Sequence, residues 1–167
     1  MKWAGIGLLA LAIAVFGLWK RATLSARVRV LKAAETLCRR VGEEIRFTAA
    51  SPAEILAKLA ADSTLSELPF LAAFAAASPG EYASRWKAET AGFSRKIGLS
   101  AEETALLSAF GAALGTTDAK SQQTHCAAFA ERFRERWTAA EQEAGEKGRL
   151  YASLGGLGAL AAVLVCI

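Results

Sequence analysis

The chain has 167 residues, 53% of them hydrophobic and 22% charged, which is enough for one small domain with a modest core. Its 20 Lys and Arg against 16 Asp and Glu give a net charge of +4, but no basic patch with aromatic residues and no known motif indicates nucleic-acid binding. Three separated cysteines (Cys38, Cys126 and Cys166) and a single histidine, His125, lack the spacing of zinc ligands.

The first predicted element is an apolar helix in residues 1–20. Residues 3–19 carry no charge and would span about 26 Å as a helix, close to the ~30 Å hydrocarbon core of a bilayer. Trp3 and Trp19 stand near its ends, where amphipathic rings prefer the headgroup level. A cleaved signal peptide is the alternative, but basic residues follow the run where a small-residue cleavage site would be needed. We therefore predict a retained transmembrane helix.

Residues 21–149 have a helical composition, and we predict a helical domain there. Three segments share a start signal, in which an N-cap Ser is followed three residues later by Glu. In this capping box each side chain accepts a hydrogen bond from the other residue's backbone N–H. The pairs are Ser51 with Glu54, Ser78 with Glu81, and Ser100 with Glu103. Pro52 and Pro79 follow the first two Ser residues, as is typical of the first helical position.

The spacing of apolar residues places helices at about 23–47, 52–61, 68–74, 79–96 and 101–114, and a last helix from 119 onward. Their predicted buried residues include Leu24, Val28, Leu31, Leu37, Val41, Ile45, Ile55, Leu56, Leu59, Tyr82, Trp86, Phe93, Cys126, Phe129, Phe133, Trp137 and Ala140. Gly115 should adopt the left-handed conformation after the fifth helix, and Asp118 should cap the last. The last helix should continue toward the C-terminus, interrupted at most near residues 145–148.

Residues 150–167 form a second charge-free run, which would span about 27 Å as a helix. A buried core helix is the alternative to a transmembrane helix, but the run reaches the last residue and contains several glycines. Ala152 with Gly156 has the spacing of small residues that let two membrane helices approach. Basic residues follow the first run and precede the second, so residues 21–149 should be cytosolic. The predicted fold is all-α, a small antiparallel helical bundle flanked by N- and C-terminal transmembrane helices.

The chain shows no catalytic constellation. It has one histidine, no Walker sequence, no Gly-rich loop after a strand and no pair of carboxylates in an apolar setting. The glycines at 155, 156 and 158 lie in the second apolar run without a preceding strand, so helix packing accounts for them better than phosphate binding does. We therefore predict a protein without enzymatic activity, cofactor or metal, which acts by placement and contact.

Two stretches of the chain carry a family resemblance. Gly115, Asp118, Gln122 and His125 lie in Leu-Gly-Thr-Thr-Asp-Ala-Lys-Ser-Gln-Gln-Thr-His, and Arg149, Tyr151, Gly155 and Gly158 lie at the entry to the last apolar run. Both stretches are similar to those of the stage III sporulation protein AB family of endospore-forming bacteria. Weaker matches are Glu44-Ile45-Arg46-Phe47, Trp86 and Leu99. Thr117 stands where the family usually has Ser, and residues 62–84 match only by pattern.

The resemblance implies a function without catalytic residues. The family implies a platform in the mother-cell membrane, within the secretion-like channel complex between mother cell and forespore. Its soluble part resembles the cytoplasmic domain of the type II secretion and type IV pilus inner-membrane platform protein. The implied partners are a cytosolic secretion-type ATPase and other membrane proteins of the complex. Association with further copies of the chain, as a homo-oligomer, is left open.

Other interpretations remain beside this one. The chain could instead be a small membrane-anchored regulatory or signalling protein unrelated to sporulation. A fragment of a type II secretion or pilus platform is a third possibility, but it should show a duplicated helical domain and three spans, whereas this chain has two predicted spans. Within the family motif, Gln122 and His125 either lock the turn before the last helix or contact a partner.

Overall fold

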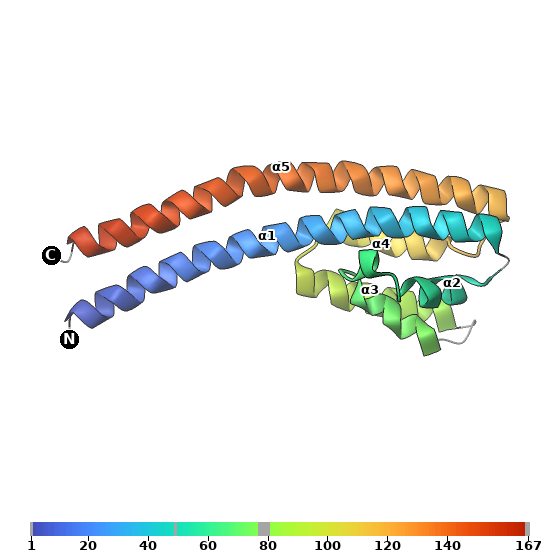
Figure 1. The fold of residues 1–167 in the computed structure, drawn as a ribbon, viewed down its shortest axis with the longest axis horizontal. Coiled ribbons are helices and arrows are strands. Elements are labelled where there is room, and N and C mark those ends of the chain that lie inside the picture. The colour runs from blue at the N-terminus through green and yellow to red at the C-terminus, as the bar shows by residue number, and fades with distance from the viewer. Residues whose placement is uncertain (1, 49, 77–80, 166–167) are drawn as a thin grey trace. The chain divides into compact units, whose positions relative to one another are not determined.

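The computed structural model describes residues 2–48, 50–76 and 81–165, with side chains described except at residue 76 and at most positions before residue 15 and after residue 150. Its elements are α1 (Lys2–Phe47), α2 (Pro52–Leu59), the 3₁₀ helices η1 (Ser63–Leu65) and η2 (Pro69–Ala76), α3 (Tyr82–Ile97), α4 (Ala101–Ala113) and α5 (Ala119–Val165) (Figure 1). The described residues form no strand, which confirms the predicted all-α class. The chain divides into two compact units, residues 1–28 with 139–167 (unit 1) and residues 29–138 (unit 2).

Local signals in the sequence set most of the helix starts. Ser51 and Glu54 form the predicted capping box, in which the Ser51 N–H donates to the Glu54 carboxylate at 2.7 Å. Ser100 and Glu103 form the second, with the corresponding bond at 2.8 Å. The carboxylate of Asp118 accepts the backbone N–H groups of Lys120 and Ser121, both at 3.1 Å, and so caps α5 as predicted.

The helix between these caps differs from the prediction. In the predicted box of Ser78 and Glu81, residues 78–80 lie outside the described residues. α3 begins at Tyr82, with Glu81 at the N-cap and no side-chain cap bond. The predicted short helix is the 3₁₀ helix η2, which begins at Pro69. α2 ends two residues earlier than predicted because Asp62 starts η1, its carboxylate accepting the N–H of Thr64 at 2.9 Å.

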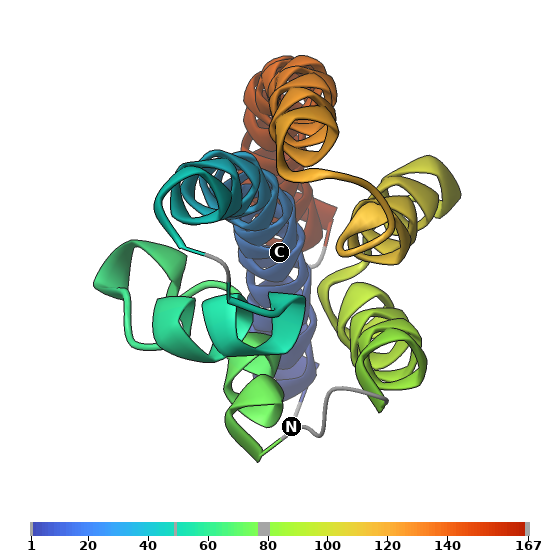
Figure 2. The same cartoon turned by 90° about the vertical axis from the view of Figure 1, so that its right-hand side faces the viewer.

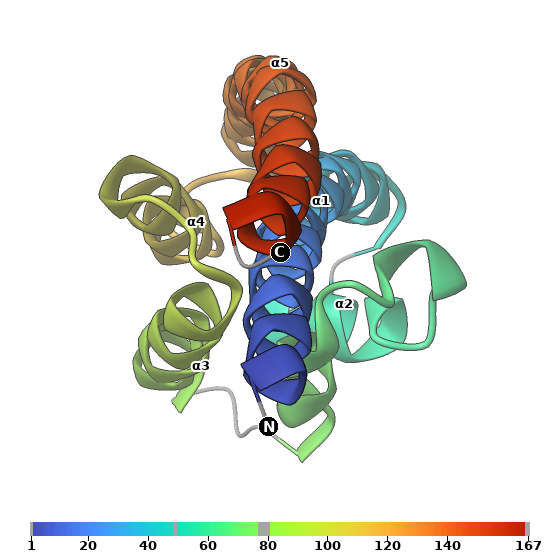
Figure 3. The same ribbon diagram turned by 90° about the vertical axis from the view of Figure 1, so that its left-hand side faces the viewer.

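The core of unit 2 is an aromatic cluster on α3, α4 and η2. Trp86 is almost fully buried, and its ring lies within 6 Å, centroid to centroid, of the rings of Phe70, Phe74 and Phe110. α3 and α4 lie side by side in both end views (Figure 2, Figure 3), and η2 packs against α3 and α2. The Trp86 indole N–H donates to the carbonyl of Leu107 at 3.0 Å, so this large ring is buried with its one polar group satisfied.

A glycine lets the Trp86 ring reach α4. A Cβ atom at Gly111 would lie 2.1 Å from Nε1 of Trp86, far inside contact distance. The Tyr82 hydroxyl donates to the carbonyl of the same glycine at 3.0 Å. Burial raises the pKa of Tyr82, which keeps this phenol protonated as a donor. Gly111 is therefore the point at which α3 and α4 interlock.

α1 buries a wider face than the predicted stripe. The predicted Val28, Leu31, Leu37 and Val41 are buried, and Leu24 and Ile45 are partly buried. The additional buried residues are Val30, Ala33, Ala34 and Cys38. These residues widen the stripe to a face that meets more than one neighbouring element, which a single-stripe pattern does not anticipate.

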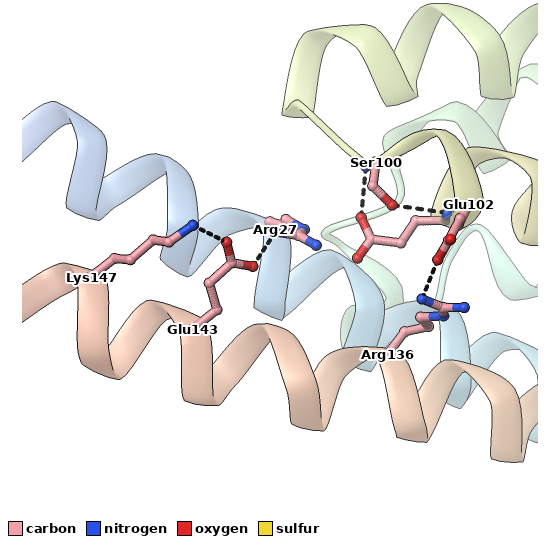
Figure 4. A network of polar contacts seen from close by, with 7 residues as sticks. Arg27, Ser100, Glu102, Arg136, Glu143 and Lys147 are labelled. Carbon is pink, nitrogen blue, oxygen red and sulfur yellow. Dashed lines mark hydrogen bonds and ion pairs between the residues drawn. The ribbon is translucent and has the colours of Figure 1, made fainter.

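Unit 1 consists of the first part of α1 and the last part of α5. In it, the Glu143 carboxylate accepts hydrogen bonds from Lys147, one turn further along α5, and from Arg27 of α1 at 2.9 Å (Figure 4). The hydrogen bonds from Lys147 and Arg27 lower the pKa of Glu143. Glu143 thus remains ionised and joins the two helices of this unit.

α5 continues unbroken through residues 145–148, as predicted. Within the described residues, no helix is both long enough and apolar enough to cross a membrane. Most side chains of the two predicted transmembrane segments, residues 1–20 and 150–167, lie outside the described residues, and the structure does not support that prediction.

The contact between Gly111 and Trp86 predicts that Gly111→Ala destabilises the protein. The added methyl would force the indole out of place, and we expect the free energy of unfolding to fall by about 1–3 kcal/mol. Gly92 on α3 is the matched control, because a Cβ there meets nothing within 4 Å. Gly92→Ala should raise stability by roughly 0.5–1 kcal/mol. Denaturant unfolding of both variants measures the difference, and equal effects would disprove the interlock.

Candidate functional site

The turn between α4 and α5 carries the first family motif. Leu114 caps the end of α4 in an extended conformation, and Gly115 follows with a φ of 79°. Thr116 donates from its hydroxyl to the carbonyl of Ala113 at 2.8 Å. The side-chain amide of Gln122 donates to the carbonyl of Thr117 at 2.6 Å. The motif residues are thus placed by backbone geometry and by short-range hydrogen bonds.

The turn rests on the start of α2. A Cβ atom at Gly115 would lie 2.9 Å from Cγ of Pro52, so a side chain would both strain the backbone and strike the proline ring. Beside this contact lies a pocket of about 200 Å³, here called the turn pocket. It is lined by Val41, Ile45, Thr48, Ala50, Pro52, Ile55, Leu114, Gly115, Ala119 and Gln122. Two connections of unit 2, α1–α2 and α4–α5, therefore meet at one place.

Gln122 and His125 occupy different environments. Gln122 is half-buried and makes the backbone hydrogen bond that the turn-locking interpretation expects. His125, almost one turn further along α5, is exposed. Partner contact by either residue stays a prediction.

The second set of motif residues belongs to unit 1. Arg149 is exposed on α5, directly after the buried Gly148. The surroundings of Tyr151, Gly155 and Gly158 lie outside the described side chains. Arg149 is therefore the one residue of this set whose side chain can be placed.

A groove lies between α1 and α5 in unit 2. On both helices its lining residues are close in sequence to those of the turn pocket. It has a volume of about 360 Å³ and is lined by Cys38, Arg39, Gly42, Glu43, Arg46, Gln123, Cys126, Ala127, Ala130 and Glu131. Its floor is tight, because a Cβ atom at Gly42 would lie 3.2 Å from Cβ of Cys126. Sequence reasoning missed this groove, although a glycine within an apolar helix stripe is a signal of close helix approach.

The two cysteines of the groove are not reactive nucleophiles. Burial, and next the neighbouring Cys126, raise the pKa of Cys38 well above its usual value. Burial raises the pKa of Cys126 to about 11. Both thiols therefore stay protonated near neutral pH, and a thiol in this state is a poor nucleophile and metal ligand.

An exposed aromatic side chain lies at the end of α1. Phe47 is 72% exposed, and the guanidinium carbon of Arg46 lies 4.6 Å from its ring centroid. Arg46 lines the α1–α5 groove, and Thr48, the next residue after Phe47, lines the turn pocket. Phe47 thus lies in sequence between a residue of the groove and a residue of the turn pocket. We call Arg46 and Phe47 the α1 tip. The spacing of apolar residues does not distinguish this tip from an ordinary helix end.

Polar side chains elsewhere in unit 2 join helices to one another. The Trp137 indole, predicted within a buried stripe, is half-buried and donates to the Glu35 carboxylate at 2.6 Å. Arg136 of α5 pairs with Glu102 of α4, close to the Ser100 cap (Figure 4). Within the described residues, no group of three or more His, Cys, Asp or Glu side chains could hold a metal ion.

Comparison with known proteins identifies one family. The family model described as stage III sporulation protein AB matches residues 2–167. No curated protein matches the chain. No solved structure matches it.

The geometry of the turn predicts different costs for two glycines with almost the same φ. Gly98 has a φ of 78°, and a Cβ there meets nothing within 4 Å. Gly98→Ala should therefore cost only the backbone strain, roughly 1–2 kcal/mol. Gly115→Ala adds the clash with Pro52 and should lower the free energy of unfolding by about 1 kcal/mol more. Denaturant unfolding compares the two variants, and equal losses of stability would show that the Pro52 ring adds nothing to the cost at Gly115.

Proposed function

Because the chain belongs to the stage III sporulation protein AB family, we propose that it is a non-enzymatic platform component of the channel complex between mother cell and forespore. Family membership gives the chain a role in stage III of sporulation. The proposal adds a secretion-like platform, similar to that of type II secretion and type IV pili. It also adds a place in the mother-cell membrane and contact with the cytosolic secretion-type ATPase.

The use of polar groups in unit 2 supports a function by contact. Asp118 and Gln122 are bonded to nearby backbone, and Glu103 is buried within a capping box. These groups hold helix ends and turns, and their hydrogen-bonding capacity is directed to the fold. The buried thiols are protonated for the reason given above. Such side chains suit a rigid support for other proteins.

The observation that carries the partner contact is the α1 tip. Phe47 exposes most of its ring, and aromatic and arginine side chains are enriched among the residues that dominate protein interfaces. Arg46 lies over the ring, so the pair offers an apolar surface with a cationic edge. Arg46 lines the groove and Thr48 lines the turn pocket, so concave surface lies close to the pair. We assign the ATPase contact to this tip.

Membrane placement is the second part of the proposal. The charge-free runs 3–19 and 150–167 are each close to the length that crosses the hydrocarbon core. Basic residues stand at their inner ends, which by the positive-inside rule orients residues 21–149 to the cytosol. Both termini then lie on the opposite side.

The proposal predicts that the α1 tip controls retention of the ATPase. Tagged full-length protein would be purified from sporulating cells and the co-purified ATPase quantified. Replacing both Arg46 and Phe47 by Ala should lower the retained ATPase about tenfold, since interface anchors contribute of the order of a tenfold change in affinity or more. The melting temperature should stay unchanged, because both side chains are exposed.

Arg95→Ala on α3 is the control, since Arg95 is also an exposed arginine near a helix end. This variant should retain the ATPase at the wild-type level. Absence of the ATPase from the wild-type preparation would contradict the platform and favour a regulatory protein. Normal retention of the ATPase by the double variant would show that the ATPase does not bind at the α1 tip.

A further inference from the structure

Unit 1 has an exposed apolar and cationic surface at the inner end of the first apolar run. Leu18 is 68% exposed and Trp19 is 60% exposed. Lys20 follows them, with its amine 5.5 Å from the Trp19 ring centroid. Arg21 comes next and is exposed. Apolar, aromatic and cationic side chains thus succeed one another over a single helical turn of α1.

α5 contributes a cationic and an apolar side chain to this surface of unit 1. Leu150 is 58% exposed, and Arg149 beside it is exposed as well. The two helices approach closely at this level, because a Cβ atom at Gly148 would lie 3.8 Å from Cγ of Arg21. The Arg21 stem therefore covers the glycine that precedes Arg149. Lys20, Arg21 and Arg149 together are called the cationic collar.

The residues of the cationic collar differ from Arg27 and Lys147 of unit 1 in their ion pairing. Arg27 and Lys147 both bond to Glu143, which neutralises them in part. No described side chain forms an ion pair with Lys20, Arg21 or Arg149. No acidic residue precedes Glu35 in the chain, and none follows Glu146. The collar therefore presents positive charge next to apolar side chains, and the nearest acidic residue in the chain, Glu146, is exposed three residues before Arg149 and forms no ion pair with it.

We propose that the cationic collar binds the headgroups of phospholipids with a net negative charge at the bilayer surface. Trp19 lies at the headgroup level, where an amphipathic ring is favoured, and Leu18 and Leu150 face the acyl chains. Lys20, Arg21 and Arg149 then meet the phosphates. The Arg27–Glu143–Lys147 network holds the two helices together one to two turns away along each helix. This inference rests on the membrane placement in the proposed function and adds a lipid class to it.

The test measures which lipid surrounds the full-length protein in vesicles of equimolar phosphatidylglycerol and phosphatidylcholine. Energy transfer from tryptophan to a dansyl-labelled form of each lipid gives the local ratio of the two. The wild type should enrich phosphatidylglycerol, with a preference of about fivefold for each basic residue at the surface. The preference should fall at ~1 M salt, where the screening length is only about 3 Å.

Variants assign the preference to the collar. Lys20→Gln, Arg21→Gln and Arg149→Gln combined should bring the ratio close to one, whereas the charge-preserving set Lys20→Arg, Arg21→Lys and Arg149→Lys should keep it. The control set Lys87→Gln, Arg95→Gln and Lys96→Gln removes three exposed charges from α3 and should leave the ratio unchanged. Circular dichroism confirms that each variant is helical.

The outcomes separate this inference from the proposed function. Protein that fails to float with either vesicle contradicts the membrane placement, and the lipid inference falls with it. Protein that floats with vesicles of both lipids but shows a ratio of one overturns the lipid inference alone. A normal ratio in the glutamine set also overturns it. If that set loses the ATPase instead, the collar binds an acidic protein surface.

Discussion

The close contact between Gly115 and Pro52 is the constraint on which the candidate site depends. With a φ of 79° and only 2.9 Å between its missing Cβ and the proline ring, this position accepts no side chain without strain. The turn can then close against the start of α2, with Asp118 capping α5 and Gln122 bonded to Thr117. Leu114 and Ala119, on either side of the turn, line the turn pocket together with residues of α1. The α1 tip beside that pocket is thereby held on a fixed support.

The polar groups of unit 2 serve its fold. Polar residues of unit 2 are directed to caps, turns and links between helices, and its thiols are buried and protonated. A protein of the stage III sporulation protein AB family with these properties fits the proposed platform. Such a platform requires a rigid support for its partners and does not require a reactive side chain. The two proposed surfaces use different units. The α1 tip of unit 2 would meet a protein, and the cationic collar of unit 1 would meet lipid.

The sequence predicted those features that depend on short-range geometry. Two capping boxes, the Asp118 cap and the positive φ at Gly115 each involve residues a few positions apart, so their spacing is sufficient. The contacts of Gly111 with Trp86 and of Gly115 with Pro52 join distant residues and depend on the folded arrangement. The 3₁₀ form of η2 and the wide buried face of α1 depend on their neighbours in the same way. The motif residues at the turn were found by family resemblance, whereas Phe47 belongs to a weaker match and gains its place in the site through its exposure.

The most direct test of the central constraint is a double-mutant cycle between Gly115 and Pro52, measured as the free energy of unfolding of the full chain in mild detergent. Gly115→Ala would be introduced into the wild type and into Pro52→Ala. The account predicts that the clash component, about 1 kcal/mol, disappears when the ring is removed, which leaves only the strain of a positive φ. An equal cost of Gly115→Ala in both backgrounds would contradict it and would show that the turn is held without the contact to α2.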